Sequence, residues 1–512
     1  MWKRWRDANG LAYLNFLFWC LVFFAAEWWF AGQISFPADD AWIHAQFARN
    51  LVTGNGLSYN PGEPVPGFSS ATWVLLSALG YLVTGDFVIS MRLWAILAGF
   101  GCIYCAGLFG RLTGDERSGR ILQWAMANSP LLVANAMTGL ESVLFAFLVS
   151  LGLWWHWAGK DKDLTGSIYG GCLWGIACLT RMESLAFYGI VFLDKVLFQR
   201  QIRDWFLAGL QMVVAFLLVL PWLLFNYSLT GSPFPATFSA KAIAAFRVTS
   251  LADTLFVNVL ALPLWVLVNN PVTAYLSVVG LWVLWKEKRW KDLRLSFVPL
   301  LFYLVRAVVH RWVAMSLYFT RYYLPTFLAP TWFAGLGLTR RPHLPWWFVG
   351  LGGMVGCLWA ANVHGWMVQN TTTMQVRIGL WLKENTPANA LIATNDVGAI
   401  AFFSQRRILD TMGLVSPEIT PIAYPKDKIG TGVIGAWEQG LLDHFRSVKP
   451  DYLVVFPRWY PWLTSQTSLL QPLLKIRLAN NVICGDDTMV VYKFLWDQKP
   501  VESAPDKANM GR

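Results

Sequence analysis

Residues 35–68 read SFPADDAWIHAQFARNLVTGNGLSYNPGEPVPGF and directly follow the first apolar run of the chain. Asp39 and Asp40 are therefore expected at or near a membrane interface, where uncompensated carboxylates are costly and usually line a polar cavity. The apolar residues after them recur at helical spacing, and His44 lies one turn beyond Asp40 on the same helical face. Acids at a helix start can be ordinary caps, but the membrane position and the long loop that follows favour a functional site.

The composition is that of a membrane protein. Of the 512 residues, 56% are hydrophobic and only 14% are charged, whereas soluble domains carry about 25% charged residues. A membrane span needs about 20 mainly apolar residues, and the sequence contains many such runs. The net charge of +11 does not indicate a nucleic-acid partner, because the basic residues cluster in short loops between apolar runs, as topology determinants do. These residues can also hold the phosphates of anionic membrane lipids.

The alternation of apolar runs and basic loops predicts a mainly α-helical, multi-pass membrane domain over residues 1–368, with the N-terminus in the cytoplasm. We expect about 11 spans, or up to about 13 if two short apolar pieces also cross. One of these pieces is Ser69–Thr84, and the other belongs to the interrupted stretch 255–285. The segments Ile121–Ala136 and Tyr322–Leu338 are each expected to cross the membrane once.

Residues 369–497 have the pattern of a soluble α/β domain, which we expect on the outer side of the membrane. One of its strands is fully apolar, which is typical of a parallel sheet, and a final pair of strands around Gly485 predicts a closing hairpin. Residues 498–512 are polar and predicted to be disordered. The elements expected in this domain are helices at Gln375–Asn385, Val397–Phe403 and Trp437–Val448, and strands at Leu391–Ala393, Arg407–Asp410, Tyr452–Phe456, Lys475–Ile483 and Met489–Phe494.

The predicted topology places further charged residues on the same, outer side as the two aspartates. Glu141 lies in the second outer turn, and Arg181 and Glu183 form a third outward cluster. Each has a simpler explanation, because Glu141 can be an acid at a helix start, and Arg181 and Glu183 can merely neutralise each other. Their shared side with Asp39 and Asp40 favours one common site.

Several motifs, taken in chain order, resemble one class of membrane enzymes. The pattern Asp-Asp-Ala-x-Ile-x-x-x-x-Ala-Arg-Asn-Leu from Asp39, followed by Gly-x-Gly-Leu and Asn-Pro-Gly-Glu, resembles the first outer loop of GT-C glycosyltransferases, which use polyprenyl-phosphate sugars. The likeness is closest to the branch that contains the mycobacterial terminal arabinofuranosyltransferases. Thr138–Ser142 resembles the second acidic motif of that branch, and Arg321–Pro325 resembles the start of a late span. Phe234–Lys241 resembles a Pro-x-Thr-Phe-Tyr-Ala-Lys signature, with Ser239 in place of the tyrosine.

This resemblance implies an integral-membrane glycosyltransferase of the bacterial plasma membrane, acting on the outer side. The donor is expected to be a polyprenyl-phosphate sugar, and the acceptor a hydroxyl of a cell-envelope glycan or glycolipid. Arabinofuranose is suggested only by the nearest branch, so the transferred sugar can be a pentose or a hexose. The reaction is expected to invert the configuration of the anomeric carbon.

The resemblance also implies roles for individual residues. In this class an acid of the first outer loop is the catalytic base, so Asp39 and Asp40 are the candidates, with Asp39 preferred on the resemblance alone. Lys241 and Arg321 are expected to bind the donor phosphate. The residues expected to bind substrate are His44, Glu141, Arg181, Glu183 and Tyr322.

No cofactor is firmly expected. Asp39 and Asp40 could hold a divalent cation through their oxygens, although many lipid-monophosphate enzymes of this class need none. The main alternative function is a transporter or flippase of lipid-linked or anionic solutes, which would place polar groups through the mid-membrane and carry paired broken helices. A third possibility is a membrane anchor for a glycan-binding domain, which leaves the loop 39–68 unexplained. The clustering of the acids on one side favours the enzyme.

Overall fold

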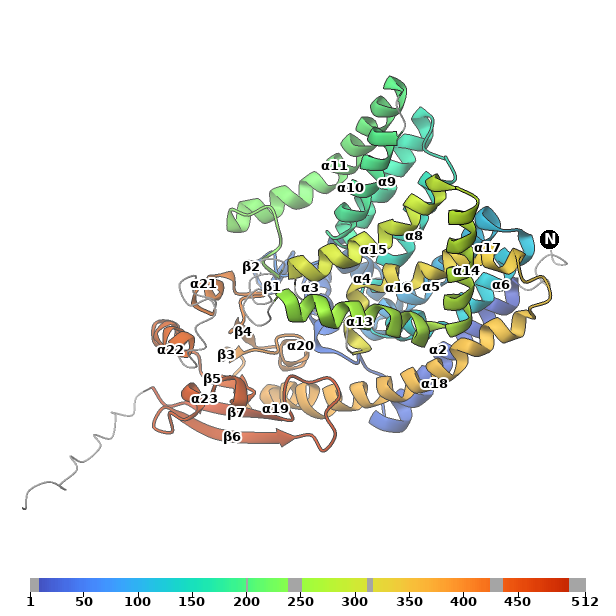
Figure 1. Ribbon diagram of the computed structural model, residues 1–512. Coiled ribbons are helices and arrows are strands. Elements are labelled where there is room, and N and C mark those ends of the chain that lie inside the picture. The colour runs from blue at the N-terminus through green and yellow to red at the C-terminus, as the bar shows by residue number, and fades with distance from the viewer. Residues whose placement is uncertain (1–8, 199–200, 238–250, 311–315, 424–435, 497–512) are drawn as a thin grey trace, which may run out of the picture.

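The structure is a computed structural model that describes residues 9–198, 201–237, 251–310, 316–423 and 436–496. Helices form a bundle over most of the chain, and a β-sheet with short helices lies at one end of this bundle (Figure 1). The prediction of a mainly α-helical chain that also contains a sheet domain is therefore confirmed. The tail predicted to be disordered lies outside the described residues.

Most helices of the bundle coincide with apolar runs of the sequence. Large apolar side chains are exposed on their outer faces, for example Leu21 (64% exposed), Leu217 (58%) and Val355 (73%), as expected for surfaces that face lipid. The helices are α2 (Asn9–Ala31), α3 (Asp39–Val52), α4 (Ala71–Thr84), α5 (Phe87–Thr113), α6 (Glu116–Ala127), α7 (Pro130–Ala136), α8 (Ser142–Trp157), α9 (Leu164–Thr180), α10 (Ser184–Phe198), α11 (Ile202–Thr230), α13 (Leu251–Asn269), α14 (Pro271–Lys286), α15 (Trp290–His310), α16 (Leu324–Leu328), α17 (Pro330–Thr339) and α18 (Trp346–Thr371).

Within the described residues, four helices are each long and apolar enough to cross a membrane. They are α2, α5, α11 and the continuous helix that begins with α18. The pair α13 and α14 passes the same test together but is bent by 114° at its break, so it is a broken span or a re-entrant loop. The other expected crossings correspond to shorter helices, and the count of about 11 spans stays a prediction.

Two segments predicted as single crossings are broken where proline occurs. Ile121–Ala136 is divided between α6 and α7, because Pro130 lacks an N–H group and disfavours helical geometry at the residue before it. Tyr322–Leu338 is divided among the 3-10 turn η1 (Tyr318–Tyr322), α16 and α17, with a proline in the first turn of each of these two helices. Each of these three prolines thus lies in the first turn of a new helix.

The sheet domain has no linker to the bundle. Helix α18 continues through a π-helical turn, η2 (Thr372–Val376), into α19 (Arg377–Asn385). The whole helix, Trp346–Asn385, has 40 residues. The domain boundary predicted near residue 368 therefore falls inside a continuous helix.

The domain is built on a five-stranded sheet of strand order β4-β3-β5-β7-β6. Strand β3 pairs parallel with both β4 and β5, whereas β7 pairs antiparallel with β5 and β6, so the predicted parallel strands and closing hairpin are both present. The strands of this domain are β3 (Leu391–Thr394), β4 (Arg407–Asp410), β5 (Tyr452–Val455), β6 (Leu470–Arg477) and β7 (Thr488–Phe494). Its short helices are α20 (Ala399–Ser404), η3 (Pro417–Ile419), α21 (Thr420–Ala423), α22 (Ala436–Val448), η5 (Pro457–Trp459) and α23 (Pro461–Thr464).

The segment predicted as the first outer loop (residues 33–68) docks on the sheet domain and shares an apolar core with it. This core joins Trp42 and Phe47 of α3 to Ile400 of α20 and Val454 of β5. The loop also carries a small antiparallel pair, β1 (Ser58–Asn60) and β2 (Glu63–Pro64), where the sequence predicted an irregular loop. The Asn60 amide donates to the carbonyl of Ile408 and accepts its N–H, over 3.0 and 2.9 Å, and so extends the edge of the sheet.

Asp39 fastens the start of α3 to this domain. Its two carboxylate oxygens accept the N–H groups of Gly398 and Ala399, each over 2.7 Å, and so cap the first turn of α20. The backbones meet so closely that a Cβ added at Gly398 would lie 2.0 Å from the carbonyl oxygen of Asp39. No side-chain rotation can relieve a clash with backbone.

We expect Gly398→Ala to destabilise the protein, because the loop and α20 must move apart to admit the methyl group. Overpacking of this kind costs about 1–3 kcal/mol, which thermal unfolding in detergent would report as a lower Tm. The control is Gly209→Ala in α11, where nothing lies within 4 Å of the added Cβ. Equal Tm values for the two variants would show that the docked arrangement of loop and sheet domain is not the one in solution.

Candidate functional site

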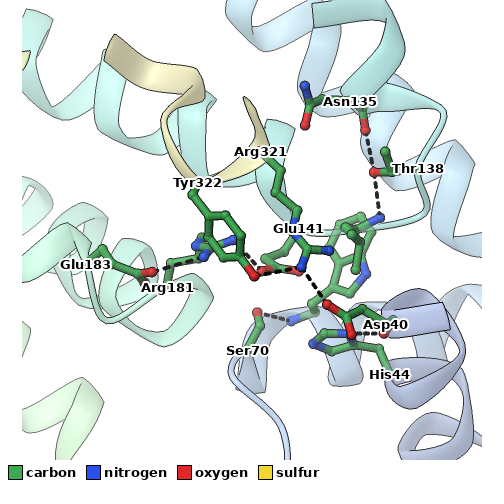
Figure 2. A network of polar contacts seen from close by, with 12 residues as sticks. Asp40, His44, Ser70, Asn135, Thr138, Glu141, Arg181, Glu183, Arg321 and Tyr322 are labelled. Carbon is green, nitrogen blue, oxygen red and sulfur yellow. Dashed lines mark hydrogen bonds and ion pairs between the residues drawn. The ribbon is translucent and has the colours of Figure 1, made fainter. Parts of the chain in front are cut away.

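An open cavity, whose empty space is about 720 Å³ with the open solvent at its mouth included, lies between α3, the turn before α8, the turn between α9 and α10, and η1. Segments far apart in sequence supply its walls, and Figure 2 shows their polar side chains converging. The cavity is lined by seven of the residues predicted as site residues: Asp40, His44, Glu141, Arg181, Glu183, Arg321 and Tyr322.

Asp40 is the acid of the first outer loop that faces this cavity. One of its oxygens is bound by the Arg321 guanidinium over 2.5 Å and accepts the Tyr318 hydroxyl over 3.0 Å. Arg321 also donates to the hydroxyl of Tyr322 over 2.6 Å, so it lies between Tyr322 and Asp40 (Figure 2). The side chain of Asp40 is 26% exposed, whereas that of Arg321 is 5% exposed. A solvent-reachable carboxylate is therefore held by a buried cation.

His44 lies beside Asp40, as the one-turn spacing predicted. Its Nδ1 is 3.3 Å from the backbone carbonyl of Asp40, and its ring is on the cavity wall. Because a carbonyl oxygen can only accept, this contact is a hydrogen bond when Nδ1 carries the proton. In that tautomer the second ring nitrogen, Nε2, carries no proton and can act only as an acceptor.

Three arginines surround the ring of Tyr322. The guanidinium carbons of Arg321, Arg306 and Arg181 lie 4.6, 4.9 and 5.0 Å from its centroid, within cation–π range. They come from η1, α15 and the end of α9, so the tyrosine gathers positive charge from three separate elements. Such a group of guanidinium donors around one cavity suits an anion with several oxygens.

Two of the three arginines share acids on the same wall. Arg181 binds Glu141 and Glu183, each over 2.9 Å, while Arg306 forms an ion pair with Glu183 over 3.4 Å. Arg306 is 5% exposed, yet its Nε and one Nη find no hydrogen-bond partner among the described residues. Unsatisfied buried donors on a charged group are costly, so Arg306 is the arginine best placed to receive an added anion.

Arg306 was not among the residues predicted from sequence. It lies in α15, within one of the apolar runs from which the membrane spans were predicted. A lone arginine inside an apolar run is itself a signal, because such charges almost always face a cavity or a partner.

Lys241, the other residue predicted to bind phosphate, lies outside the described residues. Thr237, the last described residue before this gap, forms part of the cavity wall. The neighbouring Ala236 is fixed to the first outer loop by an N–H bond to the carbonyl of Pro66 over 2.9 Å. The role of Lys241 therefore stays a prediction.

Asp39, which the family resemblance favoured as base over Asp40, points away from the cavity toward α20. It lies in a group of carboxylates with Asp40 and Asp396. Burial, and next the charge of Asp396, raise the pKa of Asp39 well above its usual range. Burial also raises the pKa of Asp396 to about 6, and the charge of Asp40 adds to this rise. The Gln375 amide donates to Asp396 over 2.8 Å and opposes the rise by stabilising the charged form.

The two adjacent aspartates do not fit a shared metal ion. Asp39 is occupied by two backbone N–H groups, and Asp40 by Arg321 and Tyr318. Throughout the part of the chain that the structure describes, no three His, Cys, Asp or Glu side chains are grouped so as to hold a metal ion.

A loop of the sheet domain closes one side of the cavity. Leu414 is on the cavity wall, and the carboxylate of Asp410 accepts the N–H groups of Met412 and Val415, each over 2.8 Å. Burial raises the pKa of Asp410 to about 6 despite these hydrogen bonds. The sheet domain thus contributes a loop with internally fixed geometry to the cavity.

Sequence comparisons match only parts of the chain. Residues 362–492 match a family described as a domain of unknown function (DUF8728). The chain is 31% identical over 136 residues to the terminal β-(1→2)-arabinofuranosyltransferase of Mycobacterium tuberculosis. This match covers 25% of the chain and spans 22% of the length of that relative.

Structural comparisons match nearly the whole chain. ArnT from Cupriavidus metallidurans, in a crystal structure bound to undecaprenyl phosphate, has a TM-score of 0.62 and 14% identity, covering 95% of this chain and 98% of ArnT. The oligosaccharyltransferase AglB of Archaeoglobus fulgidus, in complex with an inhibitory peptide and a dolichol-phosphate, has a TM-score of 0.54 and 12% identity, covering 96% of this chain and 75% of AglB. The chain therefore has the fold of GT-C membrane glycosyltransferases, as the resemblance predicted.

Proposed function

We propose that this chain is a membrane glycosyltransferase that moves a sugar from a polyprenyl phosphate to a hydroxyl of a cell-envelope glycan or glycolipid. The observation that carries this proposal is the single cavity in which Asp40 faces the three arginines around Tyr322. The structural relatives support the donor class, since they are described with undecaprenyl phosphate or a dolichol-phosphate. Arabinofuranose is the first sugar to test, because of the mycobacterial relative.

The donor phosphate is assigned to Arg306 and Arg321, with Lys241 as a third ligand. Arg181 already forms ion pairs with Glu141 and Glu183, so its proposed role is to position these two acids. Glu141 keeps one buried oxygen without a hydrogen-bond partner among the described residues, which could accept a sugar hydroxyl.

Asp40 is the proposed general base, in place of Asp39. Before the donor enters, its pairing with Arg321 stabilises the carboxylate and makes it a weak base. A donor phosphate that draws Arg321 toward itself removes this stabilisation, so Asp40 gains basicity only once the donor is in place. Donor binding is therefore expected to precede productive acceptor binding.

The chemical step follows from these positions. Asp40 takes the proton of the acceptor hydroxyl, whose oxygen forms a bond to the anomeric carbon on the face opposite the phosphate. The bond between that carbon and the phosphate oxygen breaks, and its electron pair remains on the polyprenyl phosphate. Arg306 and Arg321 stabilise the added negative charge. One displacement of this kind inverts the anomeric carbon.

The test uses the purified protein in lipid nanodiscs with short-chain polyprenyl-phosphate pentoses and hexoses and a panel of envelope-glycan acceptors. We expect polyprenyl phosphate and glycosylated acceptor to appear together by mass spectrometry, with no ion gradient present. Transport would need two compartments and would leave the donor intact. Intact donor in every donor–acceptor pair, with the donor bound, would overturn the proposal.

Asp396 is expected to make kcat depend on pH. Below about pH 6 this carboxyl is protonated, and above it the added negative charge raises the basicity of the nearby Asp40. We therefore expect kcat to rise roughly 3- to 10-fold as the pH increases through about 6. Asp396→Asn should remove this inflection, whereas Asp443→Asn, at an exposed residue of the same domain, should retain it. An unchanged inflection in Asp396→Asn would assign it to another group.

We also propose the orientation that the basic loops predict, with a cytoplasmic N-terminus and the sheet domain and cavity outside. The cavity then opens where lipid-linked sugar meets envelope glycan.

A further inference from the structure

A second open cavity, whose empty space is about 1090 Å³ with the open solvent at its mouth included, lies at the end of the bundle away from the sheet domain. Its lining residues come from the first turn of α2, from α6 and from the segment that leads into α18. These elements lie at the same end of the bundle (Figure 1). None of its residues belongs to the first cavity.

Two arginines and a histidine line this second cavity. Arg117, Arg120 and His343 lie on its wall, and no acidic residue is among the described lining residues. Arg117 donates one Nη to the carbonyl of Leu344 over 2.6 Å, which fixes its guanidinium at the cavity and leaves further N–H groups on the same fork. Two half-buried arginines without a lining carboxylate make a site for an anion of one or two charges.

The rest of the wall is aromatic and apolar. Trp124 and Trp346 pack edge to face with centroids 5.0 Å apart, and Leu11 completes the rim. Leu14 and Trp347, on α2 and α18, are 64% and 55% exposed and continue this apolar surface beyond the cavity. Tryptophan beside arginine at the end of apolar helices is typical of the membrane–water interface.

We propose that this cavity binds the phosphodiester headgroup of an anionic phospholipid from the leaflet on this side of the membrane. Arg117 and Arg120 pair with the phosphate, and the acyl chains lie along the exposed faces of α2 and α18. The charge of the two arginines would equally suit free inorganic phosphate. The continuous apolar surface beside them, however, can be contacted by the acyl chains of a lipid and not by inorganic phosphate. This site is separate from the proposed transfer chemistry.

The experiment is native mass spectrometry of the full-length, delipidated protein in detergent, titrated with phosphatidylglycerol or with phosphatidylcholine of identical acyl chains. We expect phosphatidylglycerol to be retained, with about ten-fold or greater preference over phosphatidylcholine. Arg117→Gln with Arg120→Gln should abolish this preference. The matched control, Lys160→Gln with Lys162→Gln, removes the same charge from exposed lysines of the α8–α9 turn and should leave the preference intact.

A second variant guards against loss of folding. Arg120→Gln alone keeps the bond between Arg117 and Leu344, and should reduce the preference several-fold at unchanged Tm. Inorganic phosphate at millimolar concentration is the competing probe and should displace the lipid poorly. Equal retention of the two lipids, equal losses in both double variants, or full displacement by inorganic phosphate would each overturn the proposal.

Discussion

Replacing Asp40 with asparagine is expected to lower kcat by about 10²–10⁴-fold, the contribution of a positioned general base. Asparagine has nearly the same shape, and its amide oxygen can still accept from Arg321, which binds the carboxylate over 2.5 Å. Donor binding and Tm should therefore survive while proton removal from the acceptor is lost. The measurements are polyprenyl phosphate release under single-turnover conditions and donor retention in native mass spectra.

Two neighbouring acids serve as controls. Asp39→Asn should lower Tm and leave kcat nearly unchanged. An amide cannot accept both N–H groups that the Asp39 carboxylate now accepts over 2.7 Å. Glu63→Gln, at an exposed carboxylate of the same loop that pairs with Arg407 over 2.6 Å, should change neither quantity. The opposite result, with a stable but inactive Asp39→Asn and an active Asp40→Asn, would return the role of base to Asp39.

Arg306→Gln is expected to reduce kcat/KM for the donor by about 10²–10³-fold. Removing one preorganised donor to a developing negative charge has an effect of this size, and glutamine cannot supply the charge. The fold should survive, because Glu183 keeps its ion pair with Arg181 over 2.9 Å. Steady-state kinetics with varied donor concentration would measure the loss.

Lysine at the same position gives a graded test. Arg306→Lys keeps the charge but loses the planar fork, so an intermediate loss is expected. Lys291→Gln removes a charge from an exposed residue of the same helix, α15, and should have no effect. If Arg306→Gln matched Lys291→Gln, the donor phosphate would have to bind elsewhere.

The helices and parallel strands were predictable because their signals are local. Helices that face lipid are apolar along their length, and buried parallel strands such as β5 are short continuous apolar runs. Strand β6 was shifted, from the predicted Lys475–Ile483 to Leu470–Arg477, because most of its residues are exposed and give no apolar run. The division of Ile121–Ala136 was missed because hydropathy outweighed Pro130 in the prediction.

The cavity was predictable only as a set of residues on one side of the membrane. Hydropathy and charge located Asp40, Glu141 and Arg181, but which acid faces the cavity depends on docking. Asp39 is turned away by backbone groups 359 and 360 positions further along the chain, a relation that no local pattern contains. Arg306 was missed for the opposite reason, since its apolar neighbours were interpreted only as a membrane span.

The unbroken helix from α18 to α19 sets the angle at which the sheet domain faces the bundle. An α-helix turns about 100° and rises about 1.5 Å with each residue. One residue inserted between Gly365 and Gln369 would therefore rotate the whole sheet domain by about a quarter turn, away from α3. Chimaeras that exchange sheet domains between relatives must accordingly match helical phase at the junction, and sequence similarity there is a secondary requirement.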